Sequence, residues 1–202
     1  MASTRRGAFR QYWVALRMLI IFTVVTGIVY PIVITLIGQA ALPAQANGSL
    51  ITEHGKVVGS SLIGQSFTDK KGNPLPQWFQ SRPSAAGNGY DPTASSGSNQ
   101  GTESATLIAA IKQRQATIEK LDGVTKSQIP ADAVTASASG LDPDISPAYA
   151  LLQVNTVAKA RGLNPATVRA LVEHMIQGSE LGFLGEPTVN VLQLNLALEK
   201  LG

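Results

Sequence analysis

The chain has 202 residues, of which 44% are apolar, and this composition allows one ordinary domain with a buried core plus an appendage. Four of its 16 basic residues stand at or before Arg17, so the 12 that remain face 13 acidic residues and leave the rest of the chain at a net charge of −1. A nucleic-acid-binding role is excluded because no basic patch is left to contact phosphate groups.

Residues 18–37 form the first element, twenty consecutive residues without a charge, "MLIIFTVVTGIVYPIVITLI". A helix of this length rises about 30 Å, which crosses the hydrocarbon layer of a bilayer. Four arginines precede the segment, and no charged residue follows it until Glu53. The positive-inside rule then predicts four parts: a cytoplasmic N-terminus (1–17), a single transmembrane helix (18–37), a linker (38–48) and an extracytoplasmic domain (49–202).

A cleaved secretory signal is the alternative interpretation of the N-terminus. The "AQA" of residues 44–46 has the small-residue spacing of a signal-peptidase site, and Arg5 and Arg6 weakly resemble a twin-arginine signal. Secretory apolar segments usually run about 7–15 residues. This segment is longer, so a retained anchor is favoured.

The span carries one small and polar stripe. Thr23, Thr26, Gly27 and Tyr30 lie at i, i+3, i+4 and i+7, and small residues let another helix approach closely. The stripe predicts helix packing, although Thr and Gly are also tolerated in a lone membrane helix. Pro31 follows, where a kink is expected unless a neighbouring helix compensates. Because the span contains no acid, it cannot form an ion path alone.

The domain begins with a predicted hairpin. Residues 50–52 and 57–58 are short apolar strands joined by a turn in which Gly55 can take a positive φ, and the hairpin is expected to start a sheet. Residues 69–101 are rich in Gly, Pro, Ser and Asn, which favours turns over regular structure. We expect an ordered surface here, anchored by the large aromatic side chains Trp78, Phe79 and Tyr90.

Apolar periodicity and capping residues predict three helices and a final strand–helix unit. The helices run from Thr102 to Gly123, from Ser146 to Gly162 and from Asn164 to Gly178. Val189 and Val191 then indicate a short strand that passes into a last helix. Strands at both ends with helices between them indicate an α+β domain with a small sheet and three to four helices.

Catalytic chemistry finds little support. Residues 132–150, "DAVTASASGLDPDISPAYA", contain three serines, but a serine nucleophile needs a base. The two histidines are His54, in the hairpin turn, and His174, on the polar side of the third helix, and neither stands in a catalytic motif. Without cysteine and with two distant histidines, the chain also predicts no metal site. No catalytic residue is assigned.

The same stretch has a structural interpretation. Val134 and Thr135 could end a strand, while Ser137, Ser139 and Gly140 allow two backbones to come close. Their small side chains suit tight packing, either inside the domain or against a partner. Packing within the domain is favoured over a partner surface, which stays open as the alternative because loops often carry interfaces.

Eight blocks, taken in order, resemble the C subunit of Kdp-type potassium-transporting ATPases. They are "YP" (30–31), "QANGSL" (45–50), "GSSLIGQSF" (59–67), "SRPS" (81–84), "SSGSN" (95–99), "VTASASGLD" (134–142), "VAKARGL" (157–163) and "VNVLQLNLAL" (189–198). The resemblance runs from about Tyr30 to the C-terminus. It departs at Ser96, where the family carries a second glycine, and at Thr188.

The resemblance implies a non-catalytic accessory subunit of the bacterial inner membrane. Its expected partners are a channel-like potassium-binding subunit, a P-type ATP-hydrolysing subunit, a small one-helix subunit and the lipid bilayer. ATP and K⁺ belong to the complex, and no cofactor is expected on this subunit. The blocks that carry the resemblance add Arg82 and Asn99 to Ser137, Ser139 and Gly140 as a candidate partner or tight-packing surface.

Similar proteins are described as catalytic chaperones that raise the ATP affinity of the catalytic subunit. Gln153 is the residue that tests nucleotide contact. Because the predicted topology places most of the chain outside, away from cytoplasmic ATP, we expect Gln153→Ala to leave ATP affinity unchanged. The alternative from another class is a membrane-anchored extracytoplasmic binding protein or hydrolase that acts alone.

Overall fold

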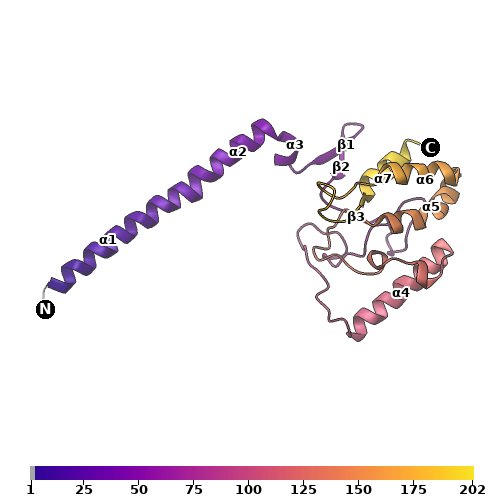
Figure 1. Cartoon of the computed structure of the whole chain (residues 1–202), viewed down its shortest axis with the longest axis horizontal. Coiled ribbons are helices and arrows are strands. Elements are labelled where there is room, and N and C mark those ends of the chain that lie inside the picture. The colour runs from indigo at the N-terminus through magenta and orange to yellow at the C-terminus, as the bar shows by residue number, and fades with distance from the viewer. Residues whose placement is uncertain (1–2) are drawn as a thin grey trace. The chain divides into compact units, whose positions relative to one another are not determined.

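The structure, a computed structural model, describes residues 3–202 and the side chains of residues 9–202. It divides into an N-terminal unit (Met1–Leu50) and a C-terminal unit (Ile51–Gly202). Figure 1 shows both units, with the α-helices and strands β1 to β3 labelled.

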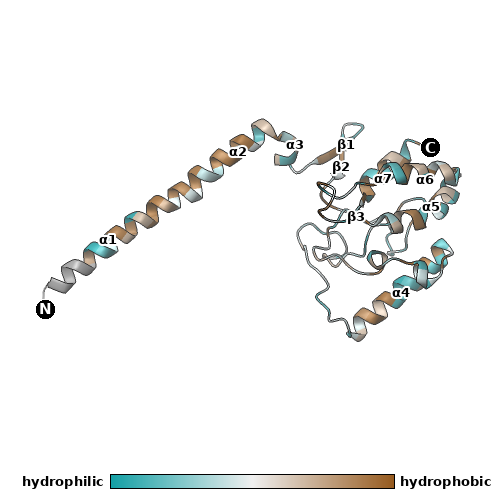
Figure 2. Ribbon diagram, viewed as in Figure 1, coloured by the Kyte–Doolittle hydropathy of each residue, from teal (hydrophilic) through white to brown (hydrophobic). Residues whose placement is uncertain are grey.

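The N-terminal unit is one long helix followed by a short one. It consists of α1 (Ser3–Val24), a π-helical segment η1 (Val25–Val29), α2 (Tyr30–Ala41) and α3 (Pro43–Ala46). Phe9–Ala41 is long and apolar enough to cross a membrane, and Figure 2 shows the brown, hydrophobic residues that dominate it. The single apolar helix expected from the sequence is therefore present, while the borders of the span within it stay a prediction.

A π turn stands where the sequence predicts a kink. The Tyr30 N–H donates to the carbonyl of Val25, five residues back, directly before Pro31. Proline in an α-helix loses one hydrogen bond and its ring clashes with the carbonyl four residues earlier, here Gly27. A π turn is a known way to accommodate such a break. The helix continues through η1 into α2 in Figure 1.

The predicted hairpin is confirmed, but it does not start a larger sheet. Strands β1 (Leu50–Glu53) and β2 (Lys56–Ser60) form a two-stranded sheet, and both turn residues, His54 and Gly55, have positive φ. Positive φ at both central positions matches the twist of a hairpin. The second sheet is separate, because its strands pair with each other and with no residue of the hairpin.

That second sheet joins β3 (Asp144–Ile145) to β4 (Val189–Asn190) in antiparallel register, with Asp144 opposite Asn190. The sequence places both valines at 189 and 191 in the strand, but Val191 begins the next helix. Asn190 is the N-cap, since its side chain accepts the Gln193 N–H at 3.1 Å. The strand is therefore shorter than its alternating pattern suggests.

Four α-helices of the described chain lie in the C-terminal unit: α4 (Ala105–Asp122), α5 (Pro147–Arg161), α6 (Pro165–His174) and α7 (Val191–Glu199). The predicted caps hold, because Ser146 accepts the Tyr149 N–H and Asn164 accepts the Ala166 N–H. Gly123 and Gly162 end their helices in the left-handed conformation. The observed α+β class agrees with the sequence.

Two further predictions from the sequence were wrong. The helix expected to reach Gly178 ends at His174, because Gln177 exchanges two backbone hydrogen bonds with Thr188 at 2.8 and 3.0 Å. Val134 and Thr135 do not end a strand. They follow the 3₁₀ turn η3 (Ala131–Ala133), and both N–H groups donate to the carbonyl of Ala131.

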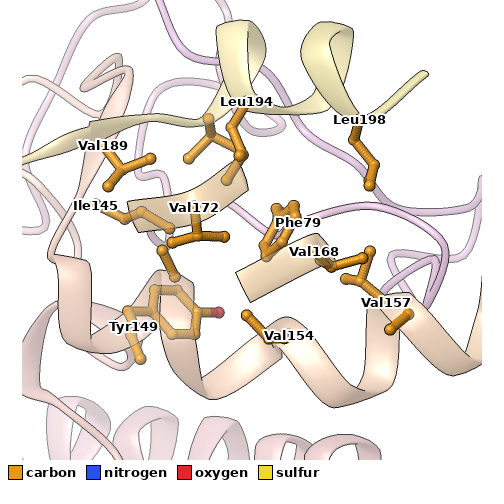
Figure 3. Close-up of a cluster of buried hydrophobic side chains, with 14 of the residues drawn as sticks. Phe79, Ile145, Tyr149, Val154, Val157, Val168, Val172, Val189, Leu194 and Leu198 are labelled. Carbon is orange, nitrogen blue, oxygen red and sulfur yellow. The ribbon is translucent and has the colours of Figure 1, made fainter. Parts of the chain in front are cut away.

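The core of the C-terminal unit lies between α5, α6 and α7. Figure 3 shows the side chains that meet there, and those below 2% exposure include Val154, Val157, Val168, Val172, Leu194 and Leu198. Phe79 is fully buried with them, although it belongs to residues 69–101, which we call the irregular segment. Burying one such ring stabilises the fold by about 1.5–3 kcal/mol. The segment without regular structure is thus tied into the core.

Candidate functional site

Two buried amides hold consecutive residues of the irregular segment. The Phe79 N–H donates to Asn195 Oδ1 of α7 at 2.9 Å, and Asn195 Nδ2 donates to the Phe79 carbonyl at 3.0 Å. The Gln80 N–H donates to Gln153 Oε1 of α5 at 2.6 Å, and Gln153 Nε2 donates to the Gln80 carbonyl at 3.3 Å. Each amide side chain acts as the missing strand partner of an extended backbone. We call these two residues the amide clamp.

The environment of Gln153 bears on its role as the nucleotide candidate. The residue is 3% exposed, and its second amide hydrogen is directed at the Tyr149 carbonyl at 3.3 Å. Both N–H donors of the side chain are therefore occupied by backbone carbonyls. This geometry gives Gln153 a positioning role in the fold.

Arg161, at the end of α5, is the third side chain that binds this segment. Its Nε donates to the Gln77 carbonyl at 2.7 Å, and its guanidinium carbon lies 4.1 Å from the centre of the Trp78 ring. Trp78 in turn contacts Phe67, with ring centroids 6.1 Å apart. A cation over an indole ring combines electrostatic attraction with packing of the planar guanidinium. Residues 77–80 are therefore held from two helices.

The serine-rich stretch contacts the loop of residues 84–97 through its backbone. Ser84 Oγ donates to the Gly140 carbonyl at 2.6 Å, and the Ser96 N–H donates to the Ser139 carbonyl at 2.9 Å. Gly140 has a φ of +67°, and a Cβ there would lie 2.6 Å from the Ser96 carbonyl oxygen. Glycine is therefore required here for both conformation and space.

The individual serines take different positions in this contact. Ser137 is buried, and its Oγ accepts the Gly140 N–H at 2.9 Å. Ser139 is exposed, and its Oγ accepts the Leu141 N–H at 3.1 Å. Ser96, where the resemblance implies a second glycine, has no positive φ. The Ser137 and Ser139 hydroxyls thus fix backbone turns.

Arg82 connects the same two segments by an ion pair. Its Nη1 lies 2.9 Å from Asp142 Oδ2, with both side chains about one quarter exposed. The Tyr90 hydroxyl donates to the Arg82 carbonyl at 2.7 Å, and burial raises the pKa of Tyr90 to about 12. Arg82, Ser137, Ser139 and Gly140 therefore share one contact region. Asn99 is exposed and has a φ of 48°.

A cavity of about 440 Å³ lies between α4 and the irregular segment. Desolvation raises the pKa of the Asp122 carboxyl in its wall, and Asp122 Oδ1 is buried without a hydrogen-bond partner. The described residues that line the cavity include serines but no histidine, so the hydroxyls have no imidazole base. Among the residues that the structure describes, no three His, Asp or Glu side chains are grouped to hold a metal ion.

The stripe of the membrane helix is exposed over all four of its residues. A Cβ on Gly27 would meet no atom within 4 Å, so nothing in the helix itself requires glycine there. Thr26 Oγ1 donates to the Phe22 carbonyl at 2.6 Å, which satisfies its hydroxyl within the helix. The π turn contains an extra residue. Tyr30 is therefore rotated around the helix axis relative to the other stripe residues, Thr23, Thr26 and Gly27.

Sequence reasoning missed Asn195 and Arg161 as organisers of the domain. One signal was available for Asn195: it stands among leucines in "VLQLNLAL", where a lone amide on an apolar helix needs a buried partner. The partner itself, Phe79, is 116 residues away in the chain. No local pattern identifies it.

Comparison with known proteins gives a consistent match over nearly the whole chain. A family model described as KdpC, the K⁺-transporting ATPase c chain, matches residues 12–200. A relative from Gemmatimonas aurantiaca, named potassium-transporting ATPase KdpC subunit, is 55% identical over 188 residues, 93% of this chain and 91% of its own. Proteins of the same name from Kineococcus radiotolerans and Methylococcus capsulatus are each 50% identical, over 94% and 93% of this chain and 93% and 96% of their own.

Proposed function

This chain belongs to the KdpC family, the c chains of K⁺-transporting ATPases, and from this premise we propose that it holds the other subunits of that ATPase together without catalysing a reaction itself. The partners are the channel-like potassium-binding subunit, the P-type ATP-hydrolysing subunit and the small one-helix subunit. A protein that binds the assembled state stabilises it by mass action.

The exposed stripe of the membrane helix is the observation that carries this proposal. Gly27 leaves a gap in the helix surface that no atom of the chain fills, and a gap of this kind lets a second helix pack closely. By contrast, the polar residues that first suggested chemistry in the C-terminal unit bind the unit's own backbone. The helix is therefore the better candidate for partner contact.

The proposed orientation follows from charge. Arg17 lies 5.1 Å from the centre of the Trp13 ring on α1, and aromatic residues and snorkelling arginines are typical of the membrane interface. We assign this end to the cytoplasm of the bacterial inner membrane and the C-terminal unit to the outer face, where it caps the side from which potassium enters. Any effect on ATP affinity would then pass through partner subunits, without nucleotide contact by Gln153.

The stripe is tested by replacing Thr23 and Gly27 with leucine in the full chain. The added side chains fill the gap, so we expect at least about tenfold less of the partner subunits to co-purify in mild detergent, which corresponds to ~1.4 kcal/mol. Potassium-stimulated ATP hydrolysis should fall with it. Tyr30→Leu should weaken assembly less, because the π turn rotates Tyr30 away from the other three.

Val33→Leu, an enlargement elsewhere on the same apolar helix, is the matched control and should leave subunit stoichiometry unchanged. Unchanged stoichiometry in the Thr23→Leu, Gly27→Leu variant would reject the stripe as the contact. A wild-type chain that purifies alone and binds or hydrolyses a small molecule would instead support the alternative, an anchored protein that acts by itself.

A further inference from the structure

The chain between α6 and β4 projects as a two-stranded flap, defined here as residues 177–188. At its base, Gln177 and Thr188 exchange backbone hydrogen bonds. Near its end, the Glu180 N–H donates to the Leu184 carbonyl and the Leu184 N–H to the Glu180 carbonyl, both at 2.9 Å. These bonds close a tight turn, residues 181–184, which we call the tip.

The tip presents three large apolar side chains to solvent. Leu181 is 80% exposed, Phe183 75% and Leu184 50%. Other exposed large apolar residues of the C-terminal unit, such as Leu62 at 62%, have no such companions within four residues of sequence. Single exposed apolar residues need no explanation, whereas a cluster of them marks a contact surface.

The backbone of the tip is also strained. Leu181 has a φ of 53°, a conformation that costs a residue with a Cβ roughly 1–2 kcal/mol. The side chain makes no compensating core contact, because it is the most exposed large apolar side chain of the described chain. Strain that the domain's own packing does not repay points to a function for the tip.

We propose that the tip is a second docking point, which inserts into an apolar socket on the extracytoplasmic surface of another protein subunit of the complex. The inference rests on the proposed function, since it places the partner in the same ATPase. It adds a contact made by the C-terminal unit to the one made by the membrane helix.

Charge distinguishes a protein socket from a lipid surface. Glu180 and Glu186 flank the tip, and no Lys or Arg occurs between Arg169 and Lys200. Segments that bind membrane surfaces carry basic residues that attract anionic lipids. Two acids beside three apolar side chains instead fit a socket with a basic or N–H-rich rim.

A small contact is sufficient because the chain is already held in the membrane. Once the helix is in place, the tip binds its socket at the effective concentration set by the linker. A few buried apolar side chains at the centre of a contact commonly contribute most of its binding energy. Phe183, as the only aromatic residue of the tip, is the expected anchor.

Photo-crosslinking in the intact complex tests the proposal. A benzophenone amino acid replaces Phe183 in the full chain, expressed with its partner subunits in membranes. We expect an adduct with another protein subunit, reduced at least roughly tenfold when Leu181 and Leu184 are also changed to serine. The same probe at Leu62, exposed but outside the flap, is the control and should give no such adduct.

Adducts with lipid, adducts with a second copy of this chain, or no adduct would each overturn the proposal. Folding is checked by the unfolding temperature, which the serine changes should leave unaltered because the side chains are exposed. Failure of the crosslink while the wild-type chain still co-purifies with its partners rejects the docking tip and leaves the proposed function standing. Failure of co-purification rejects the proposed function.

Discussion

The two units of the chain use their small and polar residues in opposite ways. On the membrane helix, Thr23 and Gly27 are exposed, and nothing within the helix needs a small residue at position 27. In the C-terminal unit, Gly140 is enclosed by backbone atoms, and Gln153 is hydrogen-bonded to the chain itself. Similar residue types therefore serve internal architecture in the C-terminal unit, whereas on the membrane helix we propose that they form a partner surface.

The comparison shows why composition alone misleads about chemistry. Ser137 and Ser139 stand in a stretch whose serines suggest a nucleophile, but their hydroxyls accept backbone N–H groups two or three residues away. Such local bonds are common for serine in turns. A polar residue becomes a functional candidate only after its internal partners have been accounted for.

The largest expected effect on the free energy of unfolding comes from a change at the backbone contact of the serine-rich stretch. Gly140→Ala places a Cβ 2.6 Å from the Ser96 oxygen and 2.7 Å from the Ala86 nitrogen, so we expect a loss of about 3 kcal/mol or more. Gly123→Ala is the matched control, with nearly the same φ and no atom within 4 Å. It should cost only about 1–2 kcal/mol.

Thermal unfolding of the full chain in detergent, followed by Trp78 fluorescence in a Trp13→Phe background, measures this difference. Equal losses for Gly140→Ala and Gly123→Ala would show that φ alone matters and that the loop and the serine-rich stretch are not tightly packed. Gly140 would then not be required for close packing inside the C-terminal unit, and its role would not differ from that of Gly27 on the membrane helix.

The second-largest expected effect on the free energy of unfolding comes from a change in the amide clamp. Gln153→Ala leaves the buried N–H and carbonyl of Gln80 without partners, which should lower the free energy of unfolding by about 2–3 kcal/mol. The ATP affinity of the assembled complex should not change. Asn155→Ala, an exposed position on the same helix, should alter stability by less than about 0.5 kcal/mol. A loss of ATP affinity at wild-type stability would contradict the positioning role.

The smallest effect concerns Asp122 and its pH dependence. Desolvation raises the pKa of this carboxyl, so the folded state binds its proton more tightly than the unfolded state. The resulting stability is present below the unfolded value of 3.8 and is lost as pH rises through the folded pKa. Asp122→Asn should therefore raise the unfolding temperature at pH 7, and the gain should disappear in acid.

Asp91 provides the control of opposite sign. Hydrogen bonds from Thr93 lower its pKa, so its contribution is present above the unfolded pKa and is lost as pH falls. Asp91→Asn should lower the unfolding temperature at pH 7. If both variants shifted it in the same direction, the desolvation of Asp122 would not be the cause.

Local signals in the sequence predicted much of the fold. Ser146, Asn164, Gly123 and Gly162 cap helices as expected, because capping depends on residues within one turn. The predicted end of α6 was too late. Met175 and Ile176 keep the apolar periodicity of the helix and pack against the core, but the backbone at Gln177 already pairs with Thr188. Tertiary pairing of this kind overrides helical pattern.

Long-range contacts of the candidate site could not be predicted. Asn195 binds Phe79 and Gln153 binds Gln80 across 116 and 73 residues, and such pairings follow from how α5 and α7 pack. The small residues around Gly140 did predict a close backbone approach, but not that Ser96 and Ala86 supply it. The stripe on the membrane helix was found from periodicity, and its role in packing stays a prediction.

The central claim is that this chain acts by holding partner subunits and has no activity of its own. The most direct test is to purify a tagged full-length chain from membranes and to measure ATP hydrolysis with and without it. The account predicts that the other ATPase subunits co-purify and that removing the chain abolishes potassium-stimulated ATP hydrolysis. A chain that purifies alone, with potassium-stimulated hydrolysis unchanged in its absence, would contradict it.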